Sequence, residues 1–251
     1  MQFSTKAAAL QPHQEGALLY ICRNRENAPD NETARLLLES LAEGERFAAA
    51  QTAESGKLKA VAVALPENDG RDALEKAAAE AAAWAQKQEN PHISLNGFDQ
   101  NQAAEAAEIF ALAFGQAAYR FNRFKKDAKA AKLNGVTFHT EHADAVQTAL
   151  NWAEAQLYGI NLCKDLGNTA PNVCTPKYLA DTARAEAEKF GAAAKIHDKD
   201  HIREHMGSFW SVAKGSAQDP YLIELHWRGA ADKNAAPVVL VGKVITFDSG
   251  G

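Results

Sequence analysis

The feature that most constrains the fold is the alternation of short apolar runs with long alanine-rich stretches. Runs typical of strands occupy 17–22, 58–65, 92–98 and 135–139. Stretches of helical composition lie between them, at 31–43, 70–88 and 101–119. Because parallel strands need long crossover connections, this order predicts an α/β fold with a mostly parallel central sheet.

The pattern resumes after a break, which indicates a second unit. A helical stretch follows residue 142, and glycine and prolines interrupt the periodicity near 167–176. We therefore expect an N-terminal α/β domain over 1–142 and a linker helix with its junction over 143–170. The beginning of a second α/β domain is expected over 171–251.

The second unit has its own order of elements. Thr175 and Pro176 are typical of the N-cap and first position of a helix, and Gly191 is expected to close that helix. Three apolar runs follow and are predicted as strands, at 193–198, 221–227 and 237–247. In the last run, the side chains that would point to either face of a strand are apolar. This pattern is typical of a strand that is covered on both faces.

Charge and cysteine content narrow the function classes. The net charge is −5 and the isoelectric point is about 5.9, which argues against a general binder of phosphate backbones. No apolar stretch approaches the ~20 residues of a membrane span, and no secretory core follows the N-terminus. The three cysteines form no C-x-x-C pair. We expect a cytoplasmic protein with reduced thiols, without a membrane or nucleic-acid partner.

One candidate metal motif lies at 201–205. His201, Glu204 and His205 match the H-x-x-E-H pattern of the inverted zinc peptidases, with both histidines on one helical face. A third ligand would have to come from elsewhere, and Glu224 is the only glutamate further along the chain. Polar neighbours favour the alternative, in which these are solvated histidines on a surface helix.

A glycine–lysine pair at 242–243 has the wrong surroundings for a phosphate-binding loop. That loop needs an earlier glycine five residues before Gly242 and a serine or threonine directly after the lysine. Pro237 and Val244 occupy those positions. The sequence therefore excludes this motif.

Lys243 and Asp248 stand at the carboxyl end of the last apolar run. Burial disfavours a charged lysine, so Lys243 is expected to pair with a carboxylate, to reach solvent, or to lose its proton and bind a metal. Their spacing of five would place the two side chains on opposite faces of a straight strand. They can converge only if the chain bends, and an ion pair and a metal site both remain open.

The sequence VGKVITFDSGG at 241–251 resembles the signature of the leucyl aminopeptidases, also called cytosol aminopeptidases (peptidase family M17). Three further segments are similar to that family: NLCKDLGNTAPNVCTP at 161–176, MGSFWSVAKGS at 206–216 and PYLIELHW at 220–227. The resemblance covers about 160 to 251. The first half agrees with the family only in size and α/β alternation.

The resemblance implies a cytoplasmic metalloprotease, a hydrolase that releases N-terminal amino acids such as leucine from peptides. It implies two divalent metal ions, manganese or zinc, and a homo-hexamer. Lys243, as a neutral amine, and Asp248, as a bridging carboxylate, correspond to metal ligands of the family. Two such ions would activate a shared water and polarise the scissile carbonyl.

Two departures from the family pattern matter. Val244 replaces a family glycine, and a β-branched side chain would strain a backbone that needs glycine. The family's catalytic lysine and arginine and its remaining carboxylate ligands follow the signature, so we expect no catalytic residue in this chain and no activity from it alone. The alternative is a catalytically silent α/β module that binds nucleotides or DNA, or that serves as a fragment of a hexamer subunit.

Overall fold

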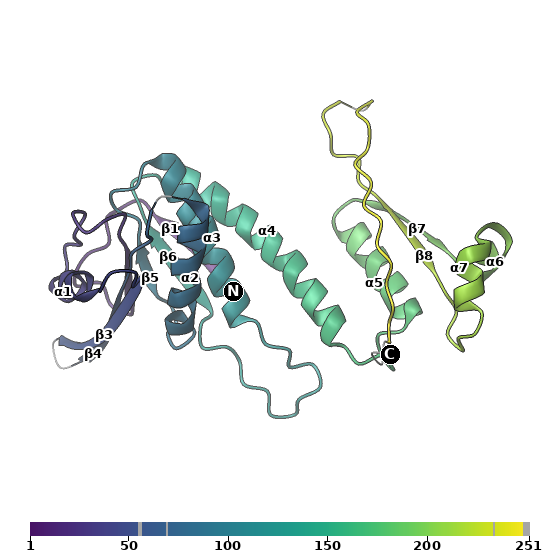
Figure 1. Ribbon diagram of the computed structural model, residues 1–251, viewed down its shortest axis with the longest axis horizontal. Coiled ribbons are helices and arrows are strands. Elements are labelled where there is room, and N and C mark those ends of the chain that lie inside the picture. The colour runs from purple at the N-terminus through teal and green to yellow at the C-terminus, as the bar shows by residue number, and fades with distance from the viewer. Residues whose placement is uncertain (55–56, 69, 233, 248–251) are drawn as a thin grey trace. The chain divides into compact units, whose positions relative to one another are not determined.

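The computed structural model describes residues 1–54, 57–68, 70–232 and 234–247. The chain divides into two compact units, Met1–Leu162 and Cys163–Gly251. The division falls within helix α4 (Ala143–Asn168) (Figure 1). The finer domain limits predicted from the sequence stay a prediction.

A six-stranded sheet forms the centre of the first unit, in the order β1-β6-β5-β2-β4-β3. Its strands are β1 (Gln2–Lys6), β2 (Leu18–Ile21), β3 (Phe47–Glu54), β4 (Lys57–Ala64), β5 (His92–Ser94) and β6 (Gly135–His139). All neighbours are parallel except β3 and β4, which are antiparallel. The predicted α/β class with a mostly parallel sheet is therefore confirmed.

Helices cover both faces of this sheet. Helix α1 (Glu32–Ser40) packs on one face, where Leu18 and Tyr20 point. Helices α2 (Arg71–Ala85), α3 (Gln100–Ala118) and α4 pack on the other, where Leu19 and Ile21 point. Alternate residues of a strand face opposite sides, so the central strand β2 is buried throughout because each of its faces is covered.

The second unit contains helices and a two-stranded antiparallel sheet. Its elements are α5 (Pro176–Lys189), β7 (Ala193–His197), α6 (Lys199–His205), α7 (Gly207–Ala213) and β8 (Leu222–His226). The Thr175 hydroxyl accepts a hydrogen bond from the Tyr178 amide at 3.3 Å. Gly191 has a φ of 70° just after the helix, so both predicted boundaries of α5 are confirmed.

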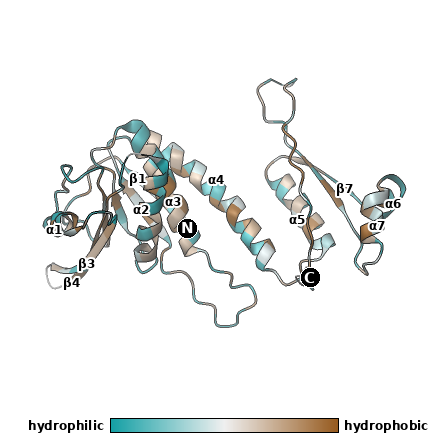
Figure 2. Ribbon diagram, in the orientation of Figure 1, coloured by the Kyte–Doolittle hydropathy of each residue, from teal (hydrophilic) through white to brown (hydrophobic). Residues whose placement is uncertain are grey.

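The predicted strand at 237–247 is wrong for the described residues. The segment has no regular secondary structure, and its residues are coloured mainly as hydrophobic (Figure 2). Val238, Leu240 and Val241 are 89%, 92% and 93% exposed. A strand needs the hydrogen-bonding ladder of a neighbour, and no described strand pairs with this segment. The hydrophobicity of this segment indicated that it favours burial, but it could not indicate whether a neighbouring strand pairs with it.

Two smaller predictions are also corrected. The expected strand at 92–98 ends at Ser94, because Gly97 adopts a φ of 83° in a turn. Gly167 does not break α4, which continues to Asn168. Helix α2 begins after Gly70, which occupies its N-cap. No helix in the described ranges is long and apolar enough to cross a bilayer.

Candidate functional site

Lys243 lies in the irregular segment near the end of the described chain, and its side chain is exposed. The expectation that it sits in a buried strand is therefore wrong. Because the side chain is exposed, no burial cost requires it to pair with a carboxylate. Asp248 lies outside the described residues, and the convergence of the two side chains stays a prediction.

The H-x-x-E-H motif forms most of helix α6. The Asp198 carboxylate accepts hydrogen bonds from the amides of Asp200 and His201, both at 3.1 Å, and thereby caps the helix. Ile202 is fully buried and anchors the helix, whereas His205 is exposed and His201 is half-buried. One face of α6 therefore packs inward, and the other carries exposed polar side chains.

Three histidine rings lie in a row, tilted against one another, along this helix and the end of β7. The ring centroids of His197 and His201 are 4.2 Å apart, and those of His201 and His205 are 4.6 Å apart. Desolvation lowers the pKa of His201, and the neighbouring rings of His197 and His205 lower it further. The neutral form of His201 is therefore favoured.

Glu224, the third ligand that the zinc interpretation would need, is bonded to other histidines. Its Oε1 lies 2.7 Å from His197 Nε2, and its Oε2 lies 3.4 Å from His226 Nε2. The hydrogen bond with His197 is the main cause that lowers the pKa of Glu224. Within the described residues no group of three histidine, cysteine, aspartate or glutamate side chains could hold a metal ion. This geometry gives no support to a zinc site at 201–205.

A histidine pair in the first unit was not found from the sequence. His92 Nδ1 and His139 Nε2 are 2.9 Å apart, on the neighbouring strands β5 and β6. His139 is only 1% exposed, and burial lowers its pKa to about 4. Burial and the nearby Lys6 lower the pKa of His92 as well. The pair is therefore neutral at physiological pH, and it joins two central strands.

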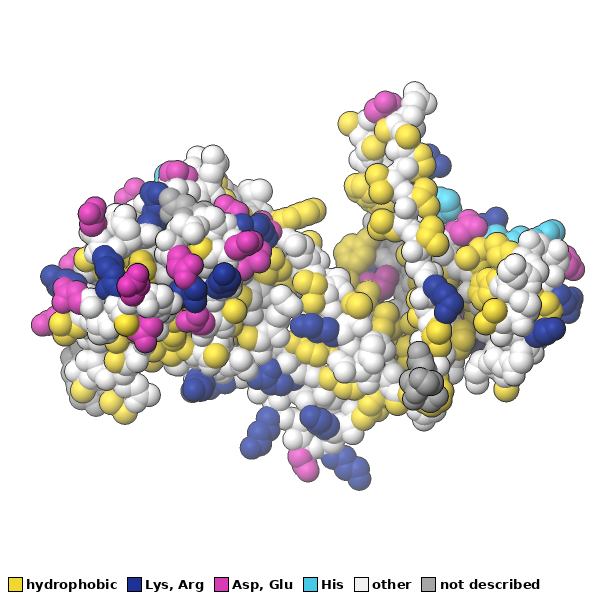
Figure 3. Space-filling model, in the orientation of Figure 1, with side chains coloured by type: hydrophobic (Ala, Val, Ile, Leu, Met, Phe, Trp, Pro, Cys, Tyr) yellow, Lys and Arg dark blue, Asp and Glu magenta, His cyan; other side chains and the backbone are white. Residues whose placement is uncertain are grey.

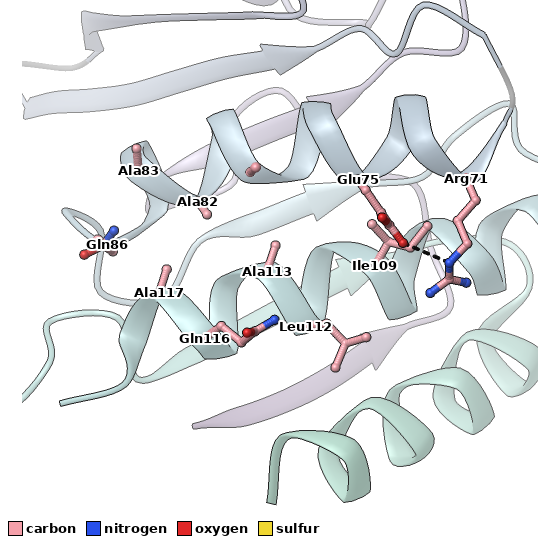
Figure 4. Close-up of a pocket in the computed structure, with 11 residues that line it drawn as sticks. Arg71, Glu75, Ala82, Ala83, Gln86, Ile109, Leu112, Ala113, Gln116 and Ala117 are labelled. Carbon is pink, nitrogen blue, oxygen red and sulfur yellow. Dashed lines mark hydrogen bonds and ion pairs between the residues drawn. The ribbon is translucent and has the colours of Figure 1, made fainter. Parts of the chain in front are cut away.

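A groove of about 550 Å³ lies between α2 and α3. Figure 4 shows the Arg71–Glu75 ion pair at one end, with an N–O distance of 2.9 Å, and alanine side chains along the middle. Gln86 and Gln116 line the other end. The lining holds no nucleophile beside a base and no group of metal ligands, so the groove is not a catalytic site.

Sequence comparison relates the chain to known peptidases. Residues 161–251 match the catalytic domain of the cytosol aminopeptidase family. The whole chain is 59% identical over 251 residues to a probable cytosol aminopeptidase of Neisseria meningitidis, of which it covers 53%. Over 145 residues, 56% of this chain, it is 48% identical to a probable cytosol aminopeptidase of Burkholderia thailandensis, covering 29% of that protein.

Comparison of folds gives two similar solved structures. A mutant of tomato leucine aminopeptidase superposes with a TM-score of 0.73 and 19% identity, over 90% of this chain and 50% of the other. The bottromycin maturation enzyme BotP, solved in complex with Mn, superposes with a TM-score of 0.60 and 20% identity, over 83% of this chain and 44% of that one. At these identities the superpositions establish the fold alone.

The chain spans about half the length of the Neisseria meningitidis relative. The match at 161–251 contains the segments that the sequence analysis compared with this family. The chain is thus similar in sequence to the cytosol aminopeptidases, and its residues 161–251 match the catalytic domain of that family, peptidase family M17.

Proposed function

We propose that this chain is part of a metal-dependent aminopeptidase that releases N-terminal amino acids such as leucine from peptides. The carrying observation is the catalytic-domain match over 161–251, which includes the complete GKVITFDSGG segment. The identity of 59% over the whole chain to a protein named as an aminopeptidase supports the same activity. Peptides are the proposed substrates.

Two divalent ions, manganese or zinc, are the proposed cofactors, with Lys243 and Asp248 among their ligands. The manganese bound to one solved relative supports this class of metal. The described side chains do not form such a site on their own, because Lys243 is exposed and no group of three ligands is present among them. Two ions need more donors than one amine and one carboxylate, so these 251 residues alone are proposed to be inactive.

The assembly and the compartment belong to the same proposal. A homo-hexamer in the cytoplasm follows from the resemblance to the family, and the relatives are named as cytosol proteins. A catalytically silent assembly module is the second candidate. The exposed apolar segment 237–247 favours it, because such a surface is stabilised when another protein surface covers it.

Leucine p-nitroanilide hydrolysis tests the proposal. The 251-residue chain with manganese or zinc should release no nitroaniline. The same chain joined to the part of the Neisseria meningitidis relative that it does not match should release it, and only with metal. Lys243→Ala and Asp248→Ala should each abolish that release in the chimera.

Lys214→Ala is the matched control, because Lys214 is an exposed lysine of the same unit. It should leave both hydrolysis and metal content unchanged. A chimera that is active but indifferent to Lys243→Ala and Asp248→Ala would refute the assignment of these two ligands. An inactive, folded chimera that binds no metal would favour the silent module.

A further inference from the structure

The connection between α3 and β6 is long, irregular and basic. We call residues 119–134 the basic loop; they contain no helix or strand. The Asn122 side-chain amide donates a hydrogen bond to the Lys129 carbonyl at 3.1 Å, which joins the two sides of the loop. Leu133 is only 1% exposed and anchors the returning end in the core. Loops of this length without secondary structure are commonly functional.

Positive charge is concentrated in the basic loop. It carries six of the 27 basic residues of the chain and one acidic residue, Asp127. The six are Arg120, Arg123, Lys125, Lys126, Lys129 and Lys132. Because the whole chain has a net charge of −5, the rest of it is strongly acidic. Figure 3 shows a group of dark blue side chains on the projection where Figure 1 has the teal loop between α3 and β6.

The four lysines of the basic loop have no ion-pair partner in the part of the chain that the structure describes. Each is exposed, and none forms an ion pair with another residue of the described ranges. Elsewhere in the molecule exposed basic side chains do find carboxylates, as Lys177 does with Asp181 and Lys199 with Asp219. The charges of these four lysines are therefore available to an external anion.

Aromatic rings lie among these charges. The rings of Phe121 and Phe124 meet edge to face, with centroids 5.7 Å apart. The Arg123 guanidinium lies 5.7 Å from the centroid of the Phe124 ring. Phe124 is 55% exposed, and among the described residues of the loop it is the only large hydrophobic side chain that is strongly exposed.

We propose that the basic loop binds single-stranded nucleic acid. Unpaired lysines would contact successive phosphates, while the exposed Phe124 ring, held by Phe121 and Arg123, would stack on a base. The acidic remainder of the chain does not prevent this, since charges beyond about 8 Å are largely screened at physiological salt. The net charge is an average over the whole chain, whereas a flexible nucleic-acid strand interacts with the charges that lie close to it.

Two other polyanions fit the loop less well. An anionic membrane would favour several apolar side chains inserting beside the lysines, and only Phe124 offers one. An acidic polypeptide could neutralise the lysines but would leave the aromatic ring without a function. The combination of unpaired lysines with an aromatic platform therefore favours a nucleic acid.

The binding test uses the full 251-residue chain and fluorescent oligothymidylate. A length of about 20 nucleotides exceeds the roughly 4–16 nucleotides of typical single-strand sites. Fluorescence anisotropy should show binding that weakens steeply as salt rises from about 50 to 200 mM. Phosphatidylserine vesicles and polyglutamate are the competing probes, and both should bind at least about tenfold more weakly than the oligonucleotide.

Variants separate the two components of the site. A triple variant with Lys125→Gln, Lys126→Gln and Lys129→Gln should bind at least about tenfold more weakly. Its salt slope, the slope of log K against the logarithm of the salt concentration, should be shallower by about 2. Phe124→Leu should weaken binding about tenfold and leave the salt slope unchanged, because it removes a stacking ring but no charge. The charge-matched control, Lys76→Gln with Lys87→Gln and Lys214→Gln, neutralises exposed lysines outside the loop and should bind nearly as the parent chain does.

Each contrary result overturns the proposal. Absence of oligonucleotide binding at low salt would do so directly. Tighter binding to vesicles than to the oligonucleotide would assign the loop to membranes instead. If polyglutamate binds as tightly as the oligonucleotide and Phe124→Leu has no effect, the loop is a non-specific cationic surface. Circular dichroism of every variant should match the parent chain, because all substituted side chains are exposed and the core is untouched.

Discussion

His92 Nδ1 and His139 Nε2 lie 2.9 Å apart and link the parallel strands β5 and β6 through their side chains. One ring nitrogen must donate and the other must accept, so at least one ring is neutral. Since His139 is 1% exposed, its protonated form is strongly disfavoured. The link is therefore lost when both rings are protonated.

We expect the first unit to lose stability in mild acid because of this pair. The folded pKa of His139, about 4, lies below its ordinary value of 6.5, so folding favours the neutral form. The contribution is fully present above pH 6.5 and is lost as the pH falls from there toward 4. It amounts to about 2–3 kcal/mol.

Urea unfolding between these pH values measures the effect. His139→Gln should be less stable at neutral pH but should show a flatter pH dependence in this window. The control His13→Gln changes an exposed histidine of the same unit and should keep the parent slope. If the parent chain is equally stable across this pH range, the protonation of the histidine pair does not affect the free energy of unfolding.

Most of the fold prediction depended on local patterns in the sequence. β2, β4 and β6 lie where hydrophobic runs indicated strands, because their side chains must fit covered faces of a sheet. Thr175 with Pro176 predicted the start of α5, since capping depends on neighbours in the sequence. The strand at 92–98 was overestimated for a similar local reason, a glycine turn at Gly97.

Long-range pairing could not be predicted in the same way. The contact between His92 and His139 joins residues 47 positions apart, and Glu224 reaches His197 across 27 positions. No periodicity encodes such partners. Net charge hid the basic loop, because an average over the chain cancels a local excess. The apolar run at 237–247 shows the same limit. Its composition indicates that it favours burial, but it does not indicate which surface would cover it.

Gly115 is predicted to be needed where α3 meets α4. A Cβ added at Gly115 would lie 2.3 Å from Leu157 Cδ1 and 2.7 Å from its Cδ2. Alanine gains roughly 0.5–1 kcal/mol of helix propensity over glycine, but forcing a packed leucine aside costs typically 1–3 kcal/mol. Leu157 is 6% exposed and has little free space, so Gly115→Ala should be destabilising by about 1 kcal/mol.

Thermal unfolding of a pair of variants checks the cause. Leu157→Ala alone should destabilise by creating a cavity. Gly115→Ala added to Leu157→Ala should cost nothing further or should be stabilising, because the clash is gone. Equal costs of Gly115→Ala in both backgrounds would mean that Leu157 does not restrict this site.

The capping box at the start of α3 is predicted to stabilise that helix. The Asp99 carboxylate accepts hydrogen bonds from the amides of Asn101 and Gln102, both at 3.0 Å. The Gln102 side chain accepts one in return from the Asp99 amide at 3.2 Å. Asp99→Ala removes the acceptor and should lower the free energy of unfolding by about 1 kcal/mol. Asp99→Asn keeps an acceptor and should cost much less, and equal losses for both would disprove the capping role.

The exposed apolar segment is predicted to make the isolated chain self-associate. Val238, Leu240 and Val241 are each at least 89% exposed, and contiguous apolar surface of this kind favours contacts between molecules. Leu240→Ser with Val241→Ser should shift sedimentation toward monomer without changing the circular dichroism spectrum. Leu58→Ser, which replaces one isolated exposed leucine on β4, should leave the association unchanged. If the double variant associates as strongly as the parent chain, another surface must be responsible.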